Sequence, residues 1–392
     1  MSAHANPDIV TDGLVFKYDT GSGKSFKGEP TTNLITSGGI DFSQRSGYTN
    51  LQTSQVVDSR SPSGYACEME VQDGANINPA ARSQFGQGTN MPSSGNAFVS
   101  IFAKLEGGTY SNITPKIYNG SGTAWQSLSA LDGGSAYLTS EYRRFGYYGA
   151  ITANPGFSMT KGNSNRQTGQ KTRWHSPQVE LKSHATPFVN GTRSATQGLL
   201  DLTKNSTIDI SNASFDSNAQ MTFDGTDDYL TSSHDSSQSF TGDFSIEAVI
   251  KGESNTANCI IQKGSGNDYY QEYWLLQDMR ATSGKFTFIM GQSGNASANY
   301  LNSVSNLSRN IYYHVVALVS GSTSKIFING VEAVSGSISN RIQSTSDLRI
   351  GQRVDNFAAT NGEIPIVKLY SRALTAAEVL QNFNATKSRF GL

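Results

Sequence analysis

Residues 362–370 read GEIPIVKLY, and with the helical stretch that follows they decide the fold class of the chain. The apolar run that ends at Tyr370 predicts a strand. Pro365 lies inside this run and cannot donate a hydrogen bond to a sheet ladder, so it predicts an edge position or a β-bulge. The chain therefore closes on a strand that tolerates one irregularity.

A helix follows directly and is expected over residues 371–389, SRALTAAEVLQNFNATKSR. Thr375 is a good N-cap residue, and Glu378 three positions later completes a capping box. Val379, Leu380 and Phe383 are expected to form the apolar face. Gly391, just past the end, is a typical stop signal. This short helix is expected to pack on the sheet as a closing element.

Upstream of this ending, short apolar stretches alternate with clusters of Gly, Asn, Asp and Ser. Strands are predicted at 244–250 (FSIEAVI), 286–290 (FTFIM) and 311–319 (IYYHVVALV), the last being long and apolar enough to lie centrally in a sheet. Within SKIFINGVEAV, Asn329-Gly330 predicts a tight type I′ hairpin because both residues tolerate positive φ. The C-terminal half is therefore expected to be an antiparallel β-sandwich.

The N-terminal half has the same character, with strand-like runs at 64–71, 97–103, 113–118, 143–148 and 173–181. The 392 residues favour two domains. Only 16% of residues are charged and the net charge is -1, so no basic footprint for nucleic acid or an anionic membrane is present. No apolar run reaches the roughly 18 residues that a membrane span needs. We expect an all-β protein with two antiparallel β-sandwich domains and a short C-terminal helix.

The stretch 223–230, FDGTDDYL, allows a family to be named. Together with FSIEAVI, FINGVEA and the strand-helix ending, it resembles the laminin-G-like, concanavalin A-like jelly-roll. The resemblance covers residues 196–392, and such domains occur in phage virion proteins and in secreted bacterial adhesion modules. It implies a binding or display role.

Residues 12–19, DGLVFKYD, are similar to the first strand of the same family, although about 200 residues separate them from FDGTDDYL. Either a second domain is inserted after this strand, or two domains stand in tandem and residues 1–30 are a tail or arm. The segment 31–195 resembles carbohydrate-binding-module-like jelly-rolls of phage tail and fibre proteins, through PTTNLI, WHSPQVEL and ATPFVNGTR. We expect residues 1–30 to belong to the laminin-G-like domain.

Catalytic patterns are missing from the sequence. Glycosidases of concanavalin A-like folds place carboxylates together on one strand face, but Glu247 stands alone, and Glu68 and Glu70 are expected to be a solvated strand face. The histidines do not pair at metal-binding spacing, and His314 is expected to be a satisfied core or edge residue of its strand. Cys67 and Cys259 are expected to be buried free thiols. We predict a protein that is not an enzyme.

Calcium is the metal to consider, because laminin-G-like domains frequently bind it. Asp224, Asp227 and Asp228 form an acidic turn whose oxygens suit calcium. The alternative is that Gly225 makes a tight turn and the aspartates cap backbone N–H groups. The sequence favours the capped turn and leaves calcium open.

Sugar binding requires exposed aromatic faces. The candidates are Trp125, Tyr147 and Tyr148 in the inserted segment, and Tyr269, Tyr270 and Trp274 in the C-terminal domain. Strand alternation should bury one of Tyr273 and Trp274, whereas Tyr269 and Tyr270 follow a turn and are expected on a loop. For each aromatic taken singly, core packing is the alternative.

The resemblances together imply a phage virion protein: a fibre, spike or decoration subunit located on the particle surface. Its expected partners are other virion proteins and host-surface glycans, and such a subunit is expected to form a homo-oligomer such as a trimer. The N-terminus has no basic stretch followed by an apolar run, so no signal peptide is expected. The alternatives are a secreted or cell-surface carbohydrate-binding protein and, less favoured, a glycosidase or depolymerase.

Overall fold

The structure is a computed structural model. It describes residues 7–35, 40–43, 51–72, 83–84, 95–107, 113–118, 125–151, 156–161, 168–280, 284–294, 297–303 and 306–392. The chain divides into two compact units. Unit 1 comprises Met1–Pro30, Ser194–Asp216 and Gln220–Leu392, and unit 2 comprises Thr31–Arg193 with Ser217–Ala219.

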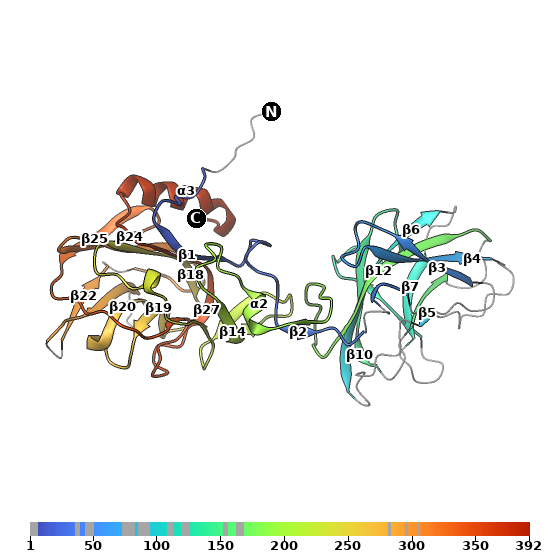
Figure 1. Cartoon of the computed structure of the whole chain (residues 1–392), viewed down its shortest axis with the longest axis horizontal. Helices are drawn as coiled ribbons and strands as arrows, with labels where there is room; N and C mark the ends of the chain where they lie inside the picture. Colours follow the sequence, from blue (N-terminus) through green and yellow to red (C-terminus); the bar gives the residue numbers. More distant parts are fainter. Residues whose placement is uncertain are drawn as a thin grey trace. The chain divides into compact units, whose positions relative to one another are not determined.

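Both units are built from antiparallel sheets, so the all-β fold class is confirmed (Figure 1). Unit 2 is formed by residues that lie, in sequence, between two segments of unit 1. Among the described residues, no helix has the length and apolar character needed to cross a membrane.

The first sheet of unit 1 has eight strands in the order β15-β16-β27-β18-β23-β24-β25, and β1 also pairs with β27. These strands are β1 (Leu14–Asp19), β15 (Ser214–Phe215), β16 (Met221–Asp224), β18 (Phe244–Gly252), β23 (Tyr312–Ser320), β24 (Thr323–Ile328), β25 (Val331–Ser337) and β27 (Asn361–Tyr370). In the pairing of β1 with β27, Tyr18 lies opposite Val367. The first strand of the chain thus belongs to the same sheet as its last strand.

The second sheet of unit 1 has seven strands in the order β14-β17-β26-β19-β20-β21-β22. They are β14 (Ile208–Asn212), β17 (Tyr229–Ser232), β26 (Leu348–Ile350), β19 (Ala257–Gly264), β20 (Gln271–Asp278), β21 (Lys285–Gly291) and β22 (Ala298–Asn302). Short helices α2 (Ala195–Gly198), η1 (Ser236–Gln238) and η2 (Asp268–Tyr270) lie in the connections.

Apolar side chains of the two sheets form one core between them, with Phe16, Phe223, Phe244 and Tyr273 among its buried members. Because side chains alternate along a strand, Trp274 next to Tyr273 lies on the outer face of the seven-stranded sheet. There it forms a separate apolar cluster with Cys259, Leu276 and Ile289. Both Cys67 and Cys259 are buried free thiols, as predicted.

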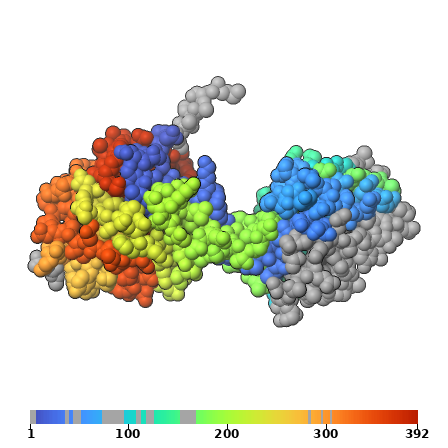
Figure 2. All heavy atoms as spheres, in the orientation of Figure 1, coloured from blue at the N-terminus to red at the C-terminus, as the bar shows by residue number. Residues whose placement is uncertain are grey.

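Helix α3 (Ala376–Phe390) packs on the eight-stranded sheet, and Thr375 and Glu378 form the predicted capping box. Gly391 ends the helix in the left-handed conformation, with φ of 69°. Val379 is buried as predicted, whereas Leu380 is exposed, so its assignment to the apolar face was wrong. Asp8 and Val10 lie beside this helix, where Val10 N donates to Asn382 Oδ1 at 2.7 Å and Gln381 Nε2 donates to Asp8 O at 2.7 Å. Figures 1 and 2 show the described N-terminal segment of unit 1 next to α3.

A buried polar network lies between α3 and the sheet. Glu247 of β18 accepts hydrogen bonds from Lys368 Nζ at 2.6 Å and from Asn382 Nδ2 at 2.6 Å. Its Oε1 also lies 3.0 Å from His314 Nε2, so His314 is a core residue as expected. Although burial raises the pKa of Glu247, Lys368 and His314 hold it below its ordinary value. Glu247 is therefore a structural carboxylate.

Three local predictions for unit 1 are confirmed. The hairpin of β24 and β25 turns at Asn329-Gly330, with φ of 49° and 81° as a type I′ turn requires. Pro365 lies where the register of β18 and β27 shifts, which is the predicted bulge. The predicted central strand is β23, which pairs with β18 and β24.

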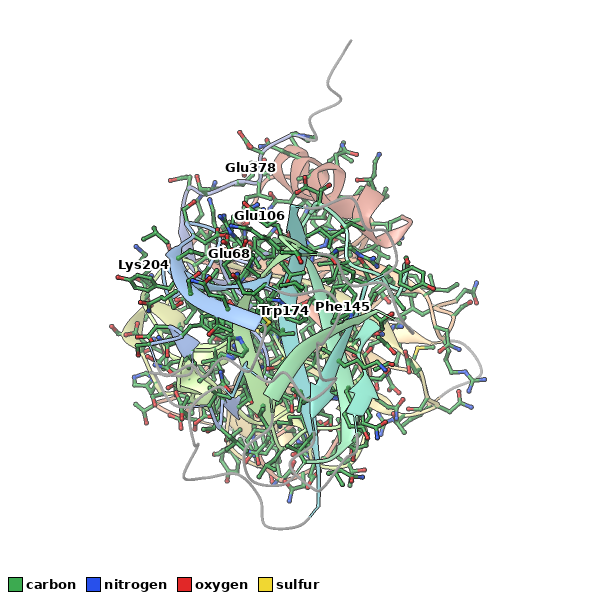
Figure 3. All side chains as sticks on the ribbon, turned by 90° about the vertical axis from the view of Figure 1, so that its right-hand side faces the viewer. Glu68, Glu106, Phe145, Trp174, Lys204 and Glu378 are labelled. Carbon is green, nitrogen blue, oxygen red and sulfur yellow. The ribbon has the colours of Figure 1, made fainter. Side chains whose placement is uncertain are left out.

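Unit 2 contains a six-stranded sheet, a four-stranded sheet and a two-stranded pair. The six-stranded sheet has the order β3 (Leu51–Val57), β4 (Tyr65–Val71), β12 (Lys171–Glu180), β6 (Asn96–Gly107), β10 (Arg143–Ala150) and β9 (Ser129–Ala130). The four-stranded sheet has the order β5 (Ser83–Gln84), β11 (Gly156–Lys161), β7 (Ile113–Tyr118) and β8 (Trp125–Ser127). The two-stranded pair is β13 (Thr192–Arg193) with β2 (Thr31–Thr32). Its core includes Trp174 and Phe145, labelled in Figure 3.

The Gln-Val-Glu and Thr-Pro-Phe elements meet in a buried polar cluster of unit 2. Glu180 is fully buried and accepts hydrogen bonds from Thr186 N at 2.9 Å and Thr31 Oγ1 at 3.0 Å. Gln178 Nε2 donates to Glu180 Oε1 at 2.9 Å. Since a buried carboxylate is costly unless it is hydrogen-bonded, these partners join the first strand of the unit, β2, to β12 and to the connection that follows β12.

Candidate functional site

Loops of unit 1 surround two adjacent hollows at one end of its sandwich. The first, which we call the Phe357 hollow, has a volume of about 320 Å³. Its lining includes Thr226, Asn255, Thr256, Arg280, Asn356 and Phe357. The second, which we call the Arg309 hollow, has a volume of about 700 Å³. Its lining includes Asn255, Arg280, Leu307, Ser308, Arg309 and Asn310.

These lining residues come from connections that are far apart in sequence. Thr226 lies in the turn between β16 and β17, and Asn255 lies in the turn between β18 and β19. Arg280 follows β20, and Phe357 belongs to the connection between β26 and β27. Binding residues concentrate on loops that a rigid scaffold holds in place, and the two sheets supply that scaffold.

Phe357 offers the exposed aromatic ring of this region, with 41% of its surface accessible. Its backbone N–H donates to Asp355 Oδ1 at 3.2 Å, and its carbonyl accepts from Arg353 N at 3.1 Å. The adjacent Ala358 has φ of 56°, a left-handed conformation that costs a non-glycine residue about 1–3 kcal/mol. The loop holds this strained conformation because Cys259 N donates to Ala358 O at 2.9 Å.

Arg353 stabilises the same loop by contacting both Phe357 and Trp274 of the underlying sheet. Its guanidinium carbon lies 4.6 Å from the ring centre of Trp274 and 4.6 Å from that of Phe357. The two rings also contact each other edge-on, with centres 6.3 Å apart. Nε and Nη2 donate to Asp355 at 2.8 and 2.7 Å, and Nη1 donates to Asp268 at 2.7 Å. Although burial raises the pKa of Asp355, Arg353 holds it below its ordinary value. We call this arrangement the Arg353 clamp.

The predicted loop aromatics lie next to the Arg353 clamp. Asp268 accepts a second hydrogen bond, from Tyr300 Oη at 2.7 Å. Burial, together with this hydrogen bond, raises the pKa of Tyr300 to about 12. Tyr270 is 54% exposed and contacts Tyr269 edge-on, with ring centres 4.6 Å apart. Both tyrosines therefore lie on a surface loop, as predicted, beside Asp268 in helix η2.

Trp274 was predicted to contact sugar from the surface, but its side chain is buried. It is only 2% exposed, and Arg353 covers its ring. Tyr273 is also buried, so alternation sends the two aromatics to opposite faces without exposing either. Assigning Trp274 as a stacking platform was wrong because a loop covers the outer face of its strand.

The unit 2 candidates do not gather at one described site. Tyr147 packs against the core of the unit, while its neighbour Tyr148 is 47% exposed. Trp125 is in β8, but its side chain lies outside the described residues. Tyr148 is thus the exposed aromatic of this pair, and Tyr147 is partly buried against the core.

The acidic turn brings its carboxylates together, since the ligand atoms of Asp224, Asp227 and Asp228 lie within 4.8 Å of one another. Asp228 accepts from Ser214 Oγ at 3.1 Å and Asp224 N at 2.7 Å, and Asp224 accepts from Thr226 N at 2.7 Å. Burial raises the pKa of Asp228, and the two neighbouring aspartates add to that effect.

These contacts allow the fit to calcium to be judged. Calcium takes about six to eight oxygen ligands. Two nearby backbone oxygens that could bind calcium already accept hydrogen bonds from side-chain amides. Asn361 Nδ2 donates to Asp224 O at 2.8 Å, and Gln352 Nε2 donates to Thr226 O at 2.9 Å. The described donor set fits a capped turn better than a calcium site, and calcium binding stays a prediction.

Glu68 and Glu70 share one face of β4, where both carboxylates contact Lys171 Nζ at 3.3 Å. Arg173 bridges Glu68 and Glu106 at 3.0 Å each, and Figure 3 labels both carboxylates. Hydrogen bonds from Arg173 and Lys171 hold the pKa of Glu68 below its ordinary value despite burial. These carboxylates therefore form an ion-pair ladder across the strands.

Sequence reasoning did not find Phe357, Arg280, Asn255 or the Arg353 clamp. The one local signal was Asp355-Asn356, a dipeptide typical of turns, which predicts a loop but not its neighbours. The convergence of these residues depends on sheet topology, which local patterns do not encode.

Comparison with known protein families gives a match for the C-terminal part of unit 1. Residues 224–380 match the family model of the concanavalin A-like lectin/glucanases superfamily. A comparison with curated proteins gave no match.

Several solved structures are similar to the chain over about half its length. The binding domain of botulinum neurotoxin serotype G has 17% identity and a TM-score of 0.38, with 49% of each chain covered. The receptor binding domain of botulinum neurotoxin D has 14% identity and a TM-score of 0.38, with 50% of this chain and 51% of that chain covered. A Trypanosoma rangeli sialidase in complex with 2,3-difluorosialic acid has 15% identity and a TM-score of 0.36, with 49% and 31% covered. This chain therefore spans about half of the two toxin structures and less of the sialidase, and scores this low say nothing about its ligand.

Proposed function

We propose that this chain is a non-enzymatic glycan-binding protein that uses the loop end of unit 1 to contact carbohydrate. The Phe357 hollow carries the proposal. An exposed aromatic ring is the surface on which a pyranose stacks, and polar groups placed around it fix the hydroxyls. Phe357 supplies the ring, while Asn255, Thr256 and Asn356 supply amides and a hydroxyl in the same hollow.

Rigidity supports this proposal as well. Binding is stronger when the site needs little ordering. The Arg353 clamp and the strained but hydrogen-bonded Ala358 hold the Phe357 ring in place without a ligand. A preformed aromatic platform is what a lectin-like site requires.

The non-enzymatic part of the proposal is supported by the carboxylates. A glycosidase needs two carboxylates facing each other across a bond, one free to donate a proton. Glu68 and Glu70 are held in ion pairs, and Glu247 is buried among Lys368, His314 and Asn382. Release of reducing ends from a host polysaccharide would contradict this part.

We place this binding function on a phage particle, as a fibre, spike or decoration subunit that contacts other virion proteins and host-surface glycans, and that forms a homo-oligomer such as a trimer. The support is the resemblance of both sequence segments to phage virion domains. A secreted or cell-surface carbohydrate-binding protein is the second candidate. Detection of the chain in purified particles would separate the two.

Glycan-array binding with three forms of the full chain tests the proposed site: the unmodified protein, Phe357→Ala and Leu380→Ala. Leu380 is a matched control because it is an exposed apolar residue of unit 1 on α3. We expect Phe357→Ala to weaken glycan binding about tenfold, as expected for loss of one aromatic contact, and Leu380→Ala to leave it unchanged. Equal binding by all three forms would remove the Phe357 hollow from the proposal, and no binding by the unmodified protein would overturn it.

A further inference from the structure

The two hollows form neighbouring parts of one groove, because Asn255 and Arg280 line both. If a sugar stacks on Phe357, the unit linked to it extends over these shared residues toward the Arg309 hollow. The residues that line the Arg309 hollow would therefore contact the second sugar unit of the ligand.

The Arg309 hollow is basic. Arg309 is exposed, and among the residues that the structure describes it has no ion-pair or hydrogen-bond partner. Arg280 pairs with Asp278 through Nε at 2.9 Å and Nη2 at 3.0 Å. Lys285 lies opposite Asp278 in the pairing of β20 with β21. The described residues that line this hollow include two arginines and no carboxylate. Within the described part of the chain, only Arg280 of the two has a carboxylate partner, so Arg309 leaves positive charge at this end of the groove.

Neutral groups beside Arg309 are held in place by the backbone. Asn310 adopts a left-handed φ of 61°, and its N–H donates to Gly252 O at 2.9 Å. Ser308 N donates to Tyr313 Oη at 2.8 Å. The polar side chains on both sides of Arg309 therefore start from fixed backbone positions, which suits them to orient a ligand group.

We propose that the Arg309 hollow binds an anionic group on the ligand, so that the glycan is an acidic oligosaccharide of at least two units. The guanidinium fork of Arg309 matches the paired oxygens of a carboxylate, a sulfate or a phosphate diester. Arg280 lies at the boundary of the two hollows, and the amides of Asn255 and Asn310 contact the sugar that carries the anion. This inference rests on the proposed function, because the neighbouring unit stacks on Phe357.

Matched ligands test the anion directly. The full chain is titrated by calorimetry with a uronate-containing oligosaccharide and with its carboxyl-reduced counterpart, which has the same backbone without the charge. Sulfated and phosphodiester-linked oligosaccharides, each beside its desulfated or dephosphorylated form, distinguish the three anion sources. We expect at least one acidic form to bind about tenfold more tightly than its neutral partner, with the preference decreasing as salt is added.

Variants locate the effect. Arg309→Gln is expected to abolish the preference for the acidic ligand while keeping the binding of the neutral one, and Arg309→Lys to restore part of it. Lys24→Gln is the control, since Lys24 is an exposed cation of unit 1 that does not line either hollow. Both arginine variants change an exposed side chain, so folding is preserved and is checked by circular dichroism.

The outcomes separate this inference from the proposed function. Equal affinity for every acidic and neutral pair, or an acidic preference that survives in Arg309→Gln, overturns the anion site but leaves glycan binding at Phe357 in place. No binding of any oligosaccharide by the unmodified chain overturns both.

Discussion

Replacing Arg353 with Met removes the guanidinium while keeping a side chain that covers Trp274. Arg353 is 7% exposed and contacts Asp268, Asp355, Trp274 and Phe357. We expect the loop that carries Phe357 to open more readily in this variant, while the two sheets stay folded. Glycan binding should weaken for the same reason.

The magnitude follows from the contacts that are lost. The carboxylates of Asp268 and Asp355 are 34% and 35% exposed, so each ion pair contributes about 0.5–1 kcal/mol rather than the value of a buried pair. Each of the two aromatic contacts contributes about 0.5–1 kcal/mol. The loss is about 3 kcal/mol, which corresponds to about a 100-fold increase in the population of the open loop.

Hydrogen–deuterium exchange read out by mass spectrometry measures that opening at residues 354–359. Arg280→Met is the matched control, because Arg280 also lies over Phe357, at 5.5 Å, but pairs with Asp278 from a largely exposed position. Exchange in this segment should rise strongly in Arg353→Met and by less than about tenfold in Arg280→Met. Unchanged exchange in Arg353→Met, or equal increases in both variants, would show that the clamp does not hold the loop.

Two further predictions concern the stability of unit 1. Glu247→Gln leaves Lys368 buried without a counter-charge, so the free energy of unfolding of unit 1 should fall by about 3 kcal/mol. Hydrogen exchange of strands β18 and β27, read out by mass spectrometry at increasing urea, measures it, and unchanged exchange would contradict it. Glu378→Gln should cost about 1 kcal/mol at pH 7. Hydrogen bonds from Arg372 lower the pKa of Glu378 to about 2, so the carboxylate stabilises above pH 4.5 and loses that effect as pH falls toward 2. The difference between variant and parent should therefore shrink in acid, and a constant difference would refute the assignment.

Features fixed by neighbouring residues could be predicted from the sequence. The capping box at Thr375 and Glu378, the Asn329-Gly330 turn and the bulge at Pro365 each depend on a few adjacent side chains, and all three occur where predicted. Hydrophobic alternation likewise predicted the sheets, because it reports which strand face is buried.

The candidate site depends on which loop residues cover the outer face of the sheet, and the alternation of apolar and polar residues along a strand does not report this. Trp274 was expected to be a free aromatic, but Arg353, nearly eighty positions later in the chain, lies over it. Phe357 occurs in a polar loop and showed no pattern of its own. Leu380 failed for a related reason, since the helical period gives an apolar face but not how far the sheet extends beneath it.

The pairing of β1 with β27 also governs when unit 1 can fold. Val10 and Asn382, whose backbone N–H and side-chain oxygen are 2.7 Å apart, are separated by 372 residues. During synthesis at about 5–20 residues per second, the first strand waits roughly 20–70 seconds for its partner. The strands of unit 2 lie within Thr31–Arg193 and can assemble during that interval. Unit 1 must then bring together two chain segments that are separated in sequence by an already folded domain. A chain that stalls before β27 leaves the edge of β1 open to association with other chains.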